Sequence, residues 1–219
     1  MRLVEIRING NFEESVAASR PASFLGIEPL RRLPAFIGKC YRAFKLLVKT
    51  SMAPIQISQK ILHLGKFYPP SRGGIESLME QTLCGLSEQG VDVAGLVFNE
   101  SNPDTVNEIQ DGIRLTRIGT NFDLAGSPVN WGLVGHLRRS CADIVHLHWP
   151  NPFALLAFLA SGSRSRLVFA HHSDIIRQRA LGLLFAPFLL AGLRRASSII
   201  VTSGAMIEAS RFLKPFRHK

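Results

Sequence analysis

Short apolar runs separated by helical segments make up the chain from Lys60 onward. Five of these runs are almost continuously apolar: KILHLG (60–65), VDVAGLVF (91–98), DIVHLH (143–148), RLVFAH (166–171) and SIIVTS (198–203). A run that is apolar at every position, rather than at every second one, is typical of a strand in a parallel sheet buried on both faces. The pattern therefore predicts an α/β fold, a Rossmann-like parallel sheet with helices on both faces.

The segments between these runs carry helix and turn signals. Residues 75–90 (IESLMEQTLCGLSEQG) place apolar side chains three and four positions apart and end in a glycine, which predicts a helix. Asp111-Gly112 separates two apolar runs and predicts a hairpin of 106–109 with 113–118. Further helices are predicted around 131–139, over 152–161 and 175–195, and from 205 to 212.

Composition separates residues 1–59 from a globular domain over residues 60–219. Hydrophobic residues make up 46% of the chain and charged residues 19%, enough apolar side chains for a core. Residues 1–59 show no sustained strand pattern and carry nine Lys or Arg against four Asp or Glu. We interpret them as a basic extension, either unpacked or bearing a membrane-surface helix over 30–48 that is interrupted at Pro34. A true start at Met52 is a third option.

The net charge of +10 is compatible with nucleic acid, an anionic membrane or a phosphate-bearing substrate. Nucleic acid is not predicted as a partner, because we find no basic patch interleaved with aromatic residues and no recognition-helix pattern. The longest apolar run, 180–193, is shorter than a membrane span, and the N-terminus lacks the apolar run of a signal peptide. The three cysteines are far apart and are interpreted as plain buried thiols. A cytoplasmic location follows, with peripheral contact at the inner face of the membrane as an option.

Polar loops follow three of the predicted strands, at the strand ends where such folds bind ligands. Gly73 and Gly74 open the helix after the first strand, and a helix N-terminus preceded by glycine suits a phosphate. A plain tight turn is the alternative for this pair. Asn151 follows the strand 143–148. Four polar residues follow the strand 166–171, namely His172, Ser173, Asp174 and Arg177.

Four histidines close two of these strands. His146 and His148 are two apart on one strand and therefore share a face of the sheet. His171 and His172 point to opposite faces, and no carboxylate-bearing frame such as HExxH is present, so no metal site is predicted. We favour polar side chains that line a cleft. For His146, a buried histidine with a hydrogen bond is the alternative.

Three motifs in these loops resemble a known family. RGGIE (72–76), HLHWPNPFALLA (146–157) and HHSDIIRQ (171–178) followed by IIVTS resemble the N-terminal, acceptor-side domain of family 4 retaining glycosyltransferases of the GT-B fold. The resemblance spans about Lys60 to Phe212 and is closest to bacterial members that build O-antigen and other surface polysaccharides, including mannosyltransferases. It implies hexosyl transfer from a nucleotide-diphosphate sugar to a glycan or lipid-linked acceptor, with no cofactor and no metal.

The resemblance also implies roles for the loop residues. His172 matches the family's active-site histidine, which contacts the donor sugar near the reacting carbon. Gly73 and Gly74 would approach the donor phosphates or the acceptor, and Asp174 and Arg177 would shape the acceptor cleft or brace its loop. The substrate-binding candidates are Gly73, Gly74, Asn151, Ser173, Asp174 and Arg177. Ser173 or Asp174 could alternatively cap the helix that follows.

The family's second domain binds the nucleotide and carries a two-glutamate E-x7-E motif, and no such motif follows Lys219. Catalysis by positioning and electrostatics uses both walls of the cleft. We therefore expect these 219 residues to be inactive alone and to need a C-terminal half, which could be a separate chain. A noncatalytic sugar-binding or interaction protein is the alternative. A nucleotide-dependent oxidoreductase is disfavoured, because a GxGxxG fingerprint is missing.

Overall fold

The structure is a computed structural model that describes residues 59–219, except residues 101, 125 and 175–178. The basic extension, apart from Gln59 at the boundary, and the helix predicted over 30–48 lie outside the described residues, and so does Arg177. No helix in the described part of the chain has both the length and the apolarity needed to cross a bilayer.

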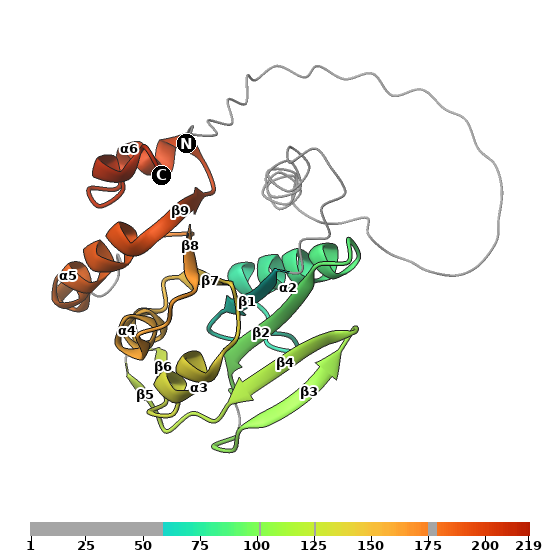
Figure 1. Cartoon of the computed structure of the whole chain (residues 1–219). Helices are drawn as coiled ribbons and strands as arrows, with labels where there is room; N and C mark the ends of the chain where they lie inside the picture. Colours follow the sequence, from blue (N-terminus) through green and yellow to red (C-terminus); the bar gives the residue numbers. More distant parts are fainter. Residues whose placement is uncertain (1–58, 101, 125, 175–178) are drawn as a thin grey trace, which may run out of the picture. The chain divides into compact units, whose positions relative to one another are not determined.

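A seven-stranded sheet carries the fold (Figure 1). Its order is β3 (Val106–Gln110), β4 (Ile113–Ile118), β2 (Asp92–Phe98), β1 (Lys60–Leu64), β7 (Ile144–Trp149), β8 (Arg166–His171) and β9 (Ala196–Val201). Neighbouring strands pair in parallel, except that β3 runs antiparallel to β4 at one edge. The predicted Rossmann-like α/β class is confirmed, with one antiparallel edge strand.

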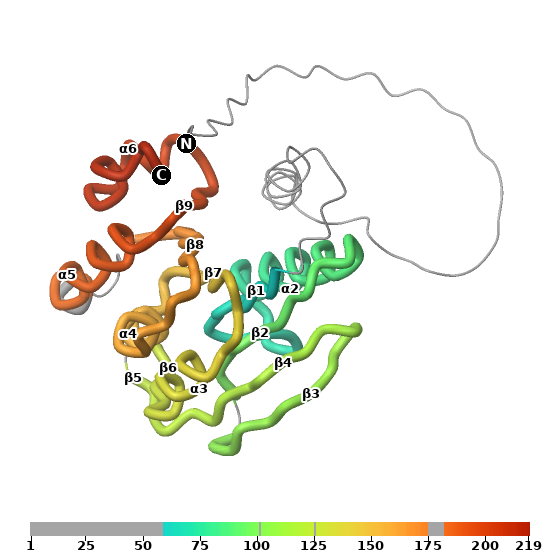
Figure 2. Tube along the Cα trace, viewed as in Figure 1, coloured from blue at the N-terminus to red at the C-terminus, as the bar shows by residue number. Residues whose placement is uncertain are grey.

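The chain reverses its direction of travel across this sheet at β1. From β1 it proceeds to β2 and β4 on one side, and it then returns to β7, β8 and β9 on the other (Figure 2). In open parallel sheets, such a reversal leaves a crevice at the carboxyl ends of the two strands that flank it. Here these strands are β1 and β7.

Helices cover the two faces unequally. Helix α2 (Gly74–Ser87) packs over β2 and β4. Helices α3 (Leu133–Arg139), α4 (Pro152–Ser161) and α5 (Arg179–Arg195) pack in series, α4 between the other two. Their apolar residues share a core cluster with Val145, Leu147 and Trp149, the odd-numbered residues of β7. Because side chains alternate along a strand, His146 and His148 point to the opposite face.

Local chemistry explains the hairpin and the ends of the helices. Asp111 and Gly112 both have positive φ angles, of 51° and 77°, as a two-residue hairpin turn requires. The predicted hairpin is confirmed. Helix α6 (Gly204–Ala209) is shorter than expected, because the chain is extended again at Ser210 and then forms the 3-10 turn η1 (Lys214–Phe216).

Two predictions about smaller features were wrong. The segment before α3, for which no strand was predicted, contains the short hairpin of β5 (Phe122–Leu124) with β6 (Ser127–Val129). Cys141 is exposed rather than buried, because it lies in the connection between α3 and β7, and Cys84 is half-buried. Cys40 lies outside the described residues.

Candidate functional site

Three neighbouring strands bring the predicted loops to one edge of the sheet. β1, β7 and β8 are adjacent and parallel, so their carboxyl ends lie together. The loop after β1 leads to Gly73 and Gly74, the loop after β7 contains Asn151, and the segment after β8 begins with His172. The first two loops flank the point where strand order reverses, which is where ligands bind in such sheets.

The N-terminus of α2 is open at Gly74. A Cβ atom placed on Gly74 would meet nothing within 4 Å, whereas one on Gly73 would meet the Glu76 carboxylate. Gly73 is in extended conformation, and its carbonyl accepts a hydrogen bond from the Ser77 amide. Space above Gly74 therefore lets a ligand approach the first amides of a 14-residue helix.

An arginine from β4 holds the loop after β1. Arg117 donates to the carbonyls of Tyr68, at 3.2 Å, and Pro69, and its Nε donates to Glu108 Oε1 at 2.6 Å. The Tyr68 side chain is fully buried, and burial raises the pKa of its hydroxyl. Arg117 was not among the residues predicted from the sequence, because nothing local marks one β4 residue as the partner of a loop some 48 positions away.

Asn151 serves as the cap of α4. Its Oδ1 accepts a hydrogen bond from the Ala154 amide at 3.2 Å, and its side chain is 1% exposed. An asparagine before a proline at the first helical position is the usual arrangement of such a cap. The position thus has a structural role, and substrate binding by Asn151 stays a prediction.

Asp174 connects the end of β8 to α6. Its Oδ1 lies 3.1 Å from Nε2 of His171 and accepts a hydrogen bond from Ser210 Oγ at 3.1 Å. Burial lowers the pKa of His171, while the charge of Asp174 and its hydrogen bond act in the opposite direction. These contacts tie the segment after β8 to the end of α6, and the role of Asp174 at the acceptor cleft stays a prediction. Ser173 is half-buried beside it, and capping of α5 by either residue falls next to positions that the structure does not describe.

A row of three histidines runs from the core to this edge. His63 Nδ1 lies 3.2 Å from His148 Nε2, and His148 Nδ1 lies 3.2 Å from His172 Nε2. His63 and His148 are buried, whereas His172 is partly exposed. We call His63, His148 and His172 the histidine row. His146 stacks beside it, with ring centroids 4.6 Å from His63 and 4.5 Å from His148.

The histidine row is electrically neutral at physiological pH. Burial lowers the pKa of His63 to about 3, and burial, aided by His171, lowers the pKa of His172 to about 4. Burial also holds the pKa of His148 well below its ordinary value, with the neighbouring histidines adding to the effect. Each ring therefore offers one N–H group and one lone pair.

His63 was not among the site residues predicted from the sequence. It sits in the middle of β1, and the parallel register places it opposite His146 of β7, 83 positions later. The signal was present, since the run KILHLG carries one histidine and the run DIVHLH carries two, each among apolar residues. Strand order and register were needed to bring the two together.

Three of these histidine side chains lie close enough to one another that a metal ion between them has to be considered. One ring nitrogen each from His63, His146 and His148 lies within 4.8 Å of the others. The group contains no carboxylate or thiolate, so a divalent charge in this buried place would have no anionic ligand to balance it. The His63–His148 nitrogen pair also already lies at hydrogen-bonding distance. We therefore assign no metal to the group.

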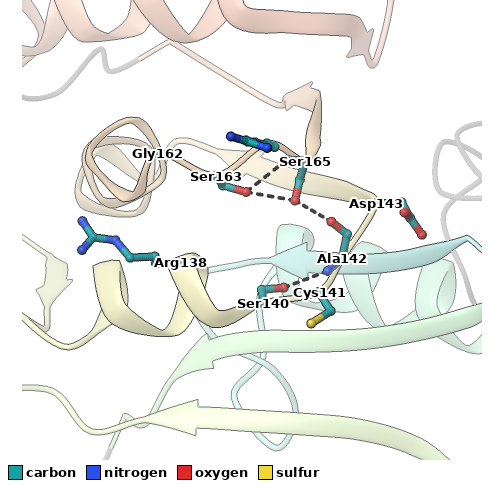
Figure 3. A pocket seen from close by; sticks show the side chains of 9 residues that line it. Arg138, Ser140, Cys141, Ala142, Asp143, Gly162, Ser163 and Ser165 are labelled. Atoms are coloured by element: carbon teal, nitrogen blue, oxygen red, sulfur yellow. Dashed lines mark hydrogen bonds between the residues drawn. The ribbon is translucent and has the colours of Figure 1, made fainter.

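A shallow pocket lies at the opposite edge of the sheet (Figure 3). It is formed at the amino ends of β7 and β8, and its lining includes Arg138, Asp143 and Ser165. Ser165 Oγ donates to the Ala142 carbonyl, and Ser163 Oγ donates to Ser165 Oγ at 2.9 Å. These hydroxyls tie two loops together, and none of the predicted site residues that the structure describes lines this pocket.

Comparison with known proteins identifies relatives among sugar transferases. Residues 73–219 match the model of the family described as "Glycosyl transferase 4-like domain". Over 163 residues, the chain is 26% identical to O-antigen chain mannosyltransferase C of Escherichia coli and 29% identical to D-rhamnosyltransferase WbpZ of Pseudomonas aeruginosa. Each alignment covers 73% of this chain, and 44% and 42% of the relatives, so the chain spans less than half of their length.

A solved structure, sucrose-phosphate synthase from Thermosynechococcus elongatus, is also similar. It shares 13% identity with a TM-score of 0.41, over 64% of this chain and 41% of the synthase.

Proposed function

Since the chain belongs to the glycosyl transferase 4-like domain family, we propose that it forms the acceptor-side wall of a retaining sugar transferase. The reaction would move a hexosyl group, mannosyl or a related sugar, from a nucleotide-diphosphate donor to a glycan or lipid-linked acceptor. The observation that carries the proposal is the position of His172, partly exposed at the carboxyl end of β8, next to the point where strand order reverses between β1 and β7. The mannosyl- and rhamnosyltransferase relatives support the choice of sugar class.

The transfer breaks the bond between the anomeric carbon and the diphosphate oxygen and forms one from that carbon to an acceptor hydroxyl oxygen. The proton of that hydroxyl passes to the departing diphosphate. Dipoles that point at the negative charge of the diphosphate would stabilise the transition state. The open N-terminus of α2 at Gly74 offers backbone N–H groups and a partial positive charge for this purpose. Asp174, tied to His171 and Ser210, would keep the segment after β8 in place.

His172 would act on the sugar as a neutral group. Its pKa of about 4 leaves the ring uncharged at neutral pH, so it contributes a hydrogen bond rather than a counter-charge to the diphosphate. A hydrogen bond to a sugar hydroxyl near the anomeric carbon would orient the donor for attack.

A lipid-linked acceptor would bring the domain to a membrane surface. Helix α5 exposes Leu183, Leu184 and Phe188, with Leu184 65% exposed. Exposed apolar side chains on a strongly basic chain support peripheral contact with an anionic membrane.

The test of this function is a sugar-transfer assay with and without a donor-binding domain. A family 4 donor domain would be supplied either after Lys219 or as a second polypeptide, with nucleotide-diphospho-mannose and nucleotide-diphospho-rhamnose as donors. We expect the 219 residues alone to transfer no measurable sugar, because one wall of the cleft cannot position both substrates. The combined assembly should form a product with retained anomeric configuration.

Two outcomes would contradict the proposal. One is His172-dependent transfer by the 219 residues alone, which would show that no donor wall is needed. The other is binding of saccharides without transfer in every assembly, which would favour a noncatalytic sugar-binding protein. The donor domain mixed with unrelated protein is the control for activity that it carries by itself.

A further inference from the structure

We propose that His148 is a positioning residue that fixes the His172 ring with its proton on Nδ1, through hydrogen bonds donated outward along the histidine row from His63. The role of His148 in catalysis rests on the proposed function, whereas the position of the proton is argued from the histidine row alone. Nδ1 is then the nitrogen through which His172 contacts a ligand.

The row is continuous and well aligned. Both nitrogen-to-nitrogen distances are 3.2 Å, within the hydrogen-bonding range. The rings of His148 and His172 are nearly parallel, at 9°, with centroids 5.4 Å apart. The His172 backbone amide also donates to the Trp149 carbonyl at 3.1 Å, which anchors it beside β7. His148 itself is 2% exposed, so no bulk water competes for its nitrogens.

Neutral imidazoles can satisfy this row in only two ways. In the outward arrangement, His63 Nδ1–H donates to His148 Nε2, and His148 Nδ1–H donates to His172 Nε2. In the inward arrangement, His172 Nε2–H donates to His148 Nδ1, and His148 Nε2–H donates to His63 Nδ1. Each neutral ring has one proton, so choosing the first bond fixes the second.

The inner end of the row selects between them. His63 Nε2 is buried and has no hydrogen-bond partner among the residues that the structure describes. The inward arrangement would put a proton on this nitrogen and leave a buried N–H group unsatisfied. The outward arrangement leaves a bare lone pair there instead, and orphaned buried N–H groups are rarer than under-satisfied acceptors. The outward arrangement is therefore favoured.

The consequence appears at the outer end of the row. His172 Nε2 accepts from His148, so the single proton of His172 is on Nδ1. His172 then presents an N–H donor to a sugar oxygen and cannot serve as a base through that nitrogen. The depressed pKa values of all three rings agree with a neutral row.

The test is long-range proton–nitrogen NMR of the ¹⁵N-labelled chain at pH 7.5, which distinguishes protonated from bare ring nitrogens without any substrate. We expect the parent chain to show His172 protonated at Nδ1. His148→Leu should shift protonation toward Nε2, because the donor is lost. His148→Asn should restore Nδ1, because its amide nitrogen can take the place of His148 Nδ1 as donor. His136→Leu, on α3 and outside the row, should leave the spectrum of His172 unchanged.

Three results would overturn the inference. They are a parent chain with His172 protonated at Nε2, a His148→Leu variant that folds and keeps the parent protonation, and a stoichiometric metal ion on the purified chain. If His148→Leu does not fold, the parent spectrum still distinguishes the outward from the inward arrangement. So does the spectrum of His63→Asn, which keeps a hydrogen-bond donor at the inner end of the row. Because no sugar transfer is measured, failure here is distinguishable from failure of the proposed function.

Discussion

Replacing His172 with alanine is expected to lower kcat/KM for sugar transfer by about 10²–10³-fold, the usual loss when one preorganised hydrogen-bond donor is removed from a transition state. The measurement requires the assembly with a donor-binding domain. The reason for the loss is positional, since His172 lies at the carboxyl end of β8 and His148 holds its Nε2, which leaves Nδ1 for the donor sugar. The acceptor KM should change less than kcat, because the contact is expected with the donor sugar.

Two matched variants separate this effect from loss of structure. His172→Asn keeps an N–H donor and should retain more activity than alanine. His136→Ala removes a half-buried histidine from α3 and should leave transfer unchanged. Unaltered transfer by a folded His172→Ala variant would remove His172 from the reaction.

Acidification is expected to destabilise the domain steeply below pH 6.5. The folded state holds the pKa of His63 at about 3 and that of His172 at about 4, against 6.5 for an ordinary histidine. Between these values the unfolded chain binds protons that the folded chain does not, so the free energy of unfolding falls as the pH falls. The loss starts near pH 6.5 and levels off only at the folded-state pKa values.

The magnitude is large compared with the stability of a domain. Each such histidine costs about 1 kcal/mol over the first pH unit below 6.5 and about 1.4 kcal/mol per unit further down, so these two alone remove roughly 2 kcal/mol between pH 6.5 and 5.5, against a typical total of about 5–15 kcal/mol. Burial shifts the pKa of His146 and of His148 in the same direction and adds to the loss.

Urea unfolding at pH 7.5, 6.5 and 5.5 would measure this dependence. A His148→Asn variant should show a shallower dependence on pH, because one buried imidazole is gone. His218→Asn removes an exposed histidine near the C-terminus and controls for the substitution itself. A free energy of unfolding that stays level from pH 7.5 to 5.5 would show that the row is not buried and neutral.

Local sequence signals predicted the elements of this fold well, and long-range geometry is what they lacked. The hairpin at Asp111-Gly112 depends only on local sequence, because these two residues adopt the positive φ angles that the turn requires. Continuous apolar runs specify buried parallel strands, because both faces of the sheet must be covered. By contrast, the strands β5 and β6 have three residues each, too few for any periodicity to develop, and β6 contains Pro128.

The candidate site was predictable in its location but not in its internal contacts. The rule that ligands bind at strand ends placed His172, Gly74 and Asn151 at one edge before strand order was known. The partners of His172 depend on register, which sets His63 beside His146 and leaves His148 between His63 and His172. Asn151 illustrates the reverse case, since its role as a cap depends only on neighbouring residues, although it was predicted only as a substrate-binding candidate.

The central claim is that ligands bind at the carboxyl edge of β1, β7 and β8. NMR titration of the 219-residue chain with a mannose-terminated disaccharide, and then with nucleotide-diphospho-mannose, tests it most directly. We predict that the signals of Gly74 and His172 shift, while those of Arg138 and Ser165, in the pocket of Figure 3, do not. Shifts confined to Arg138 and Ser165, with His172 unchanged, would contradict the account.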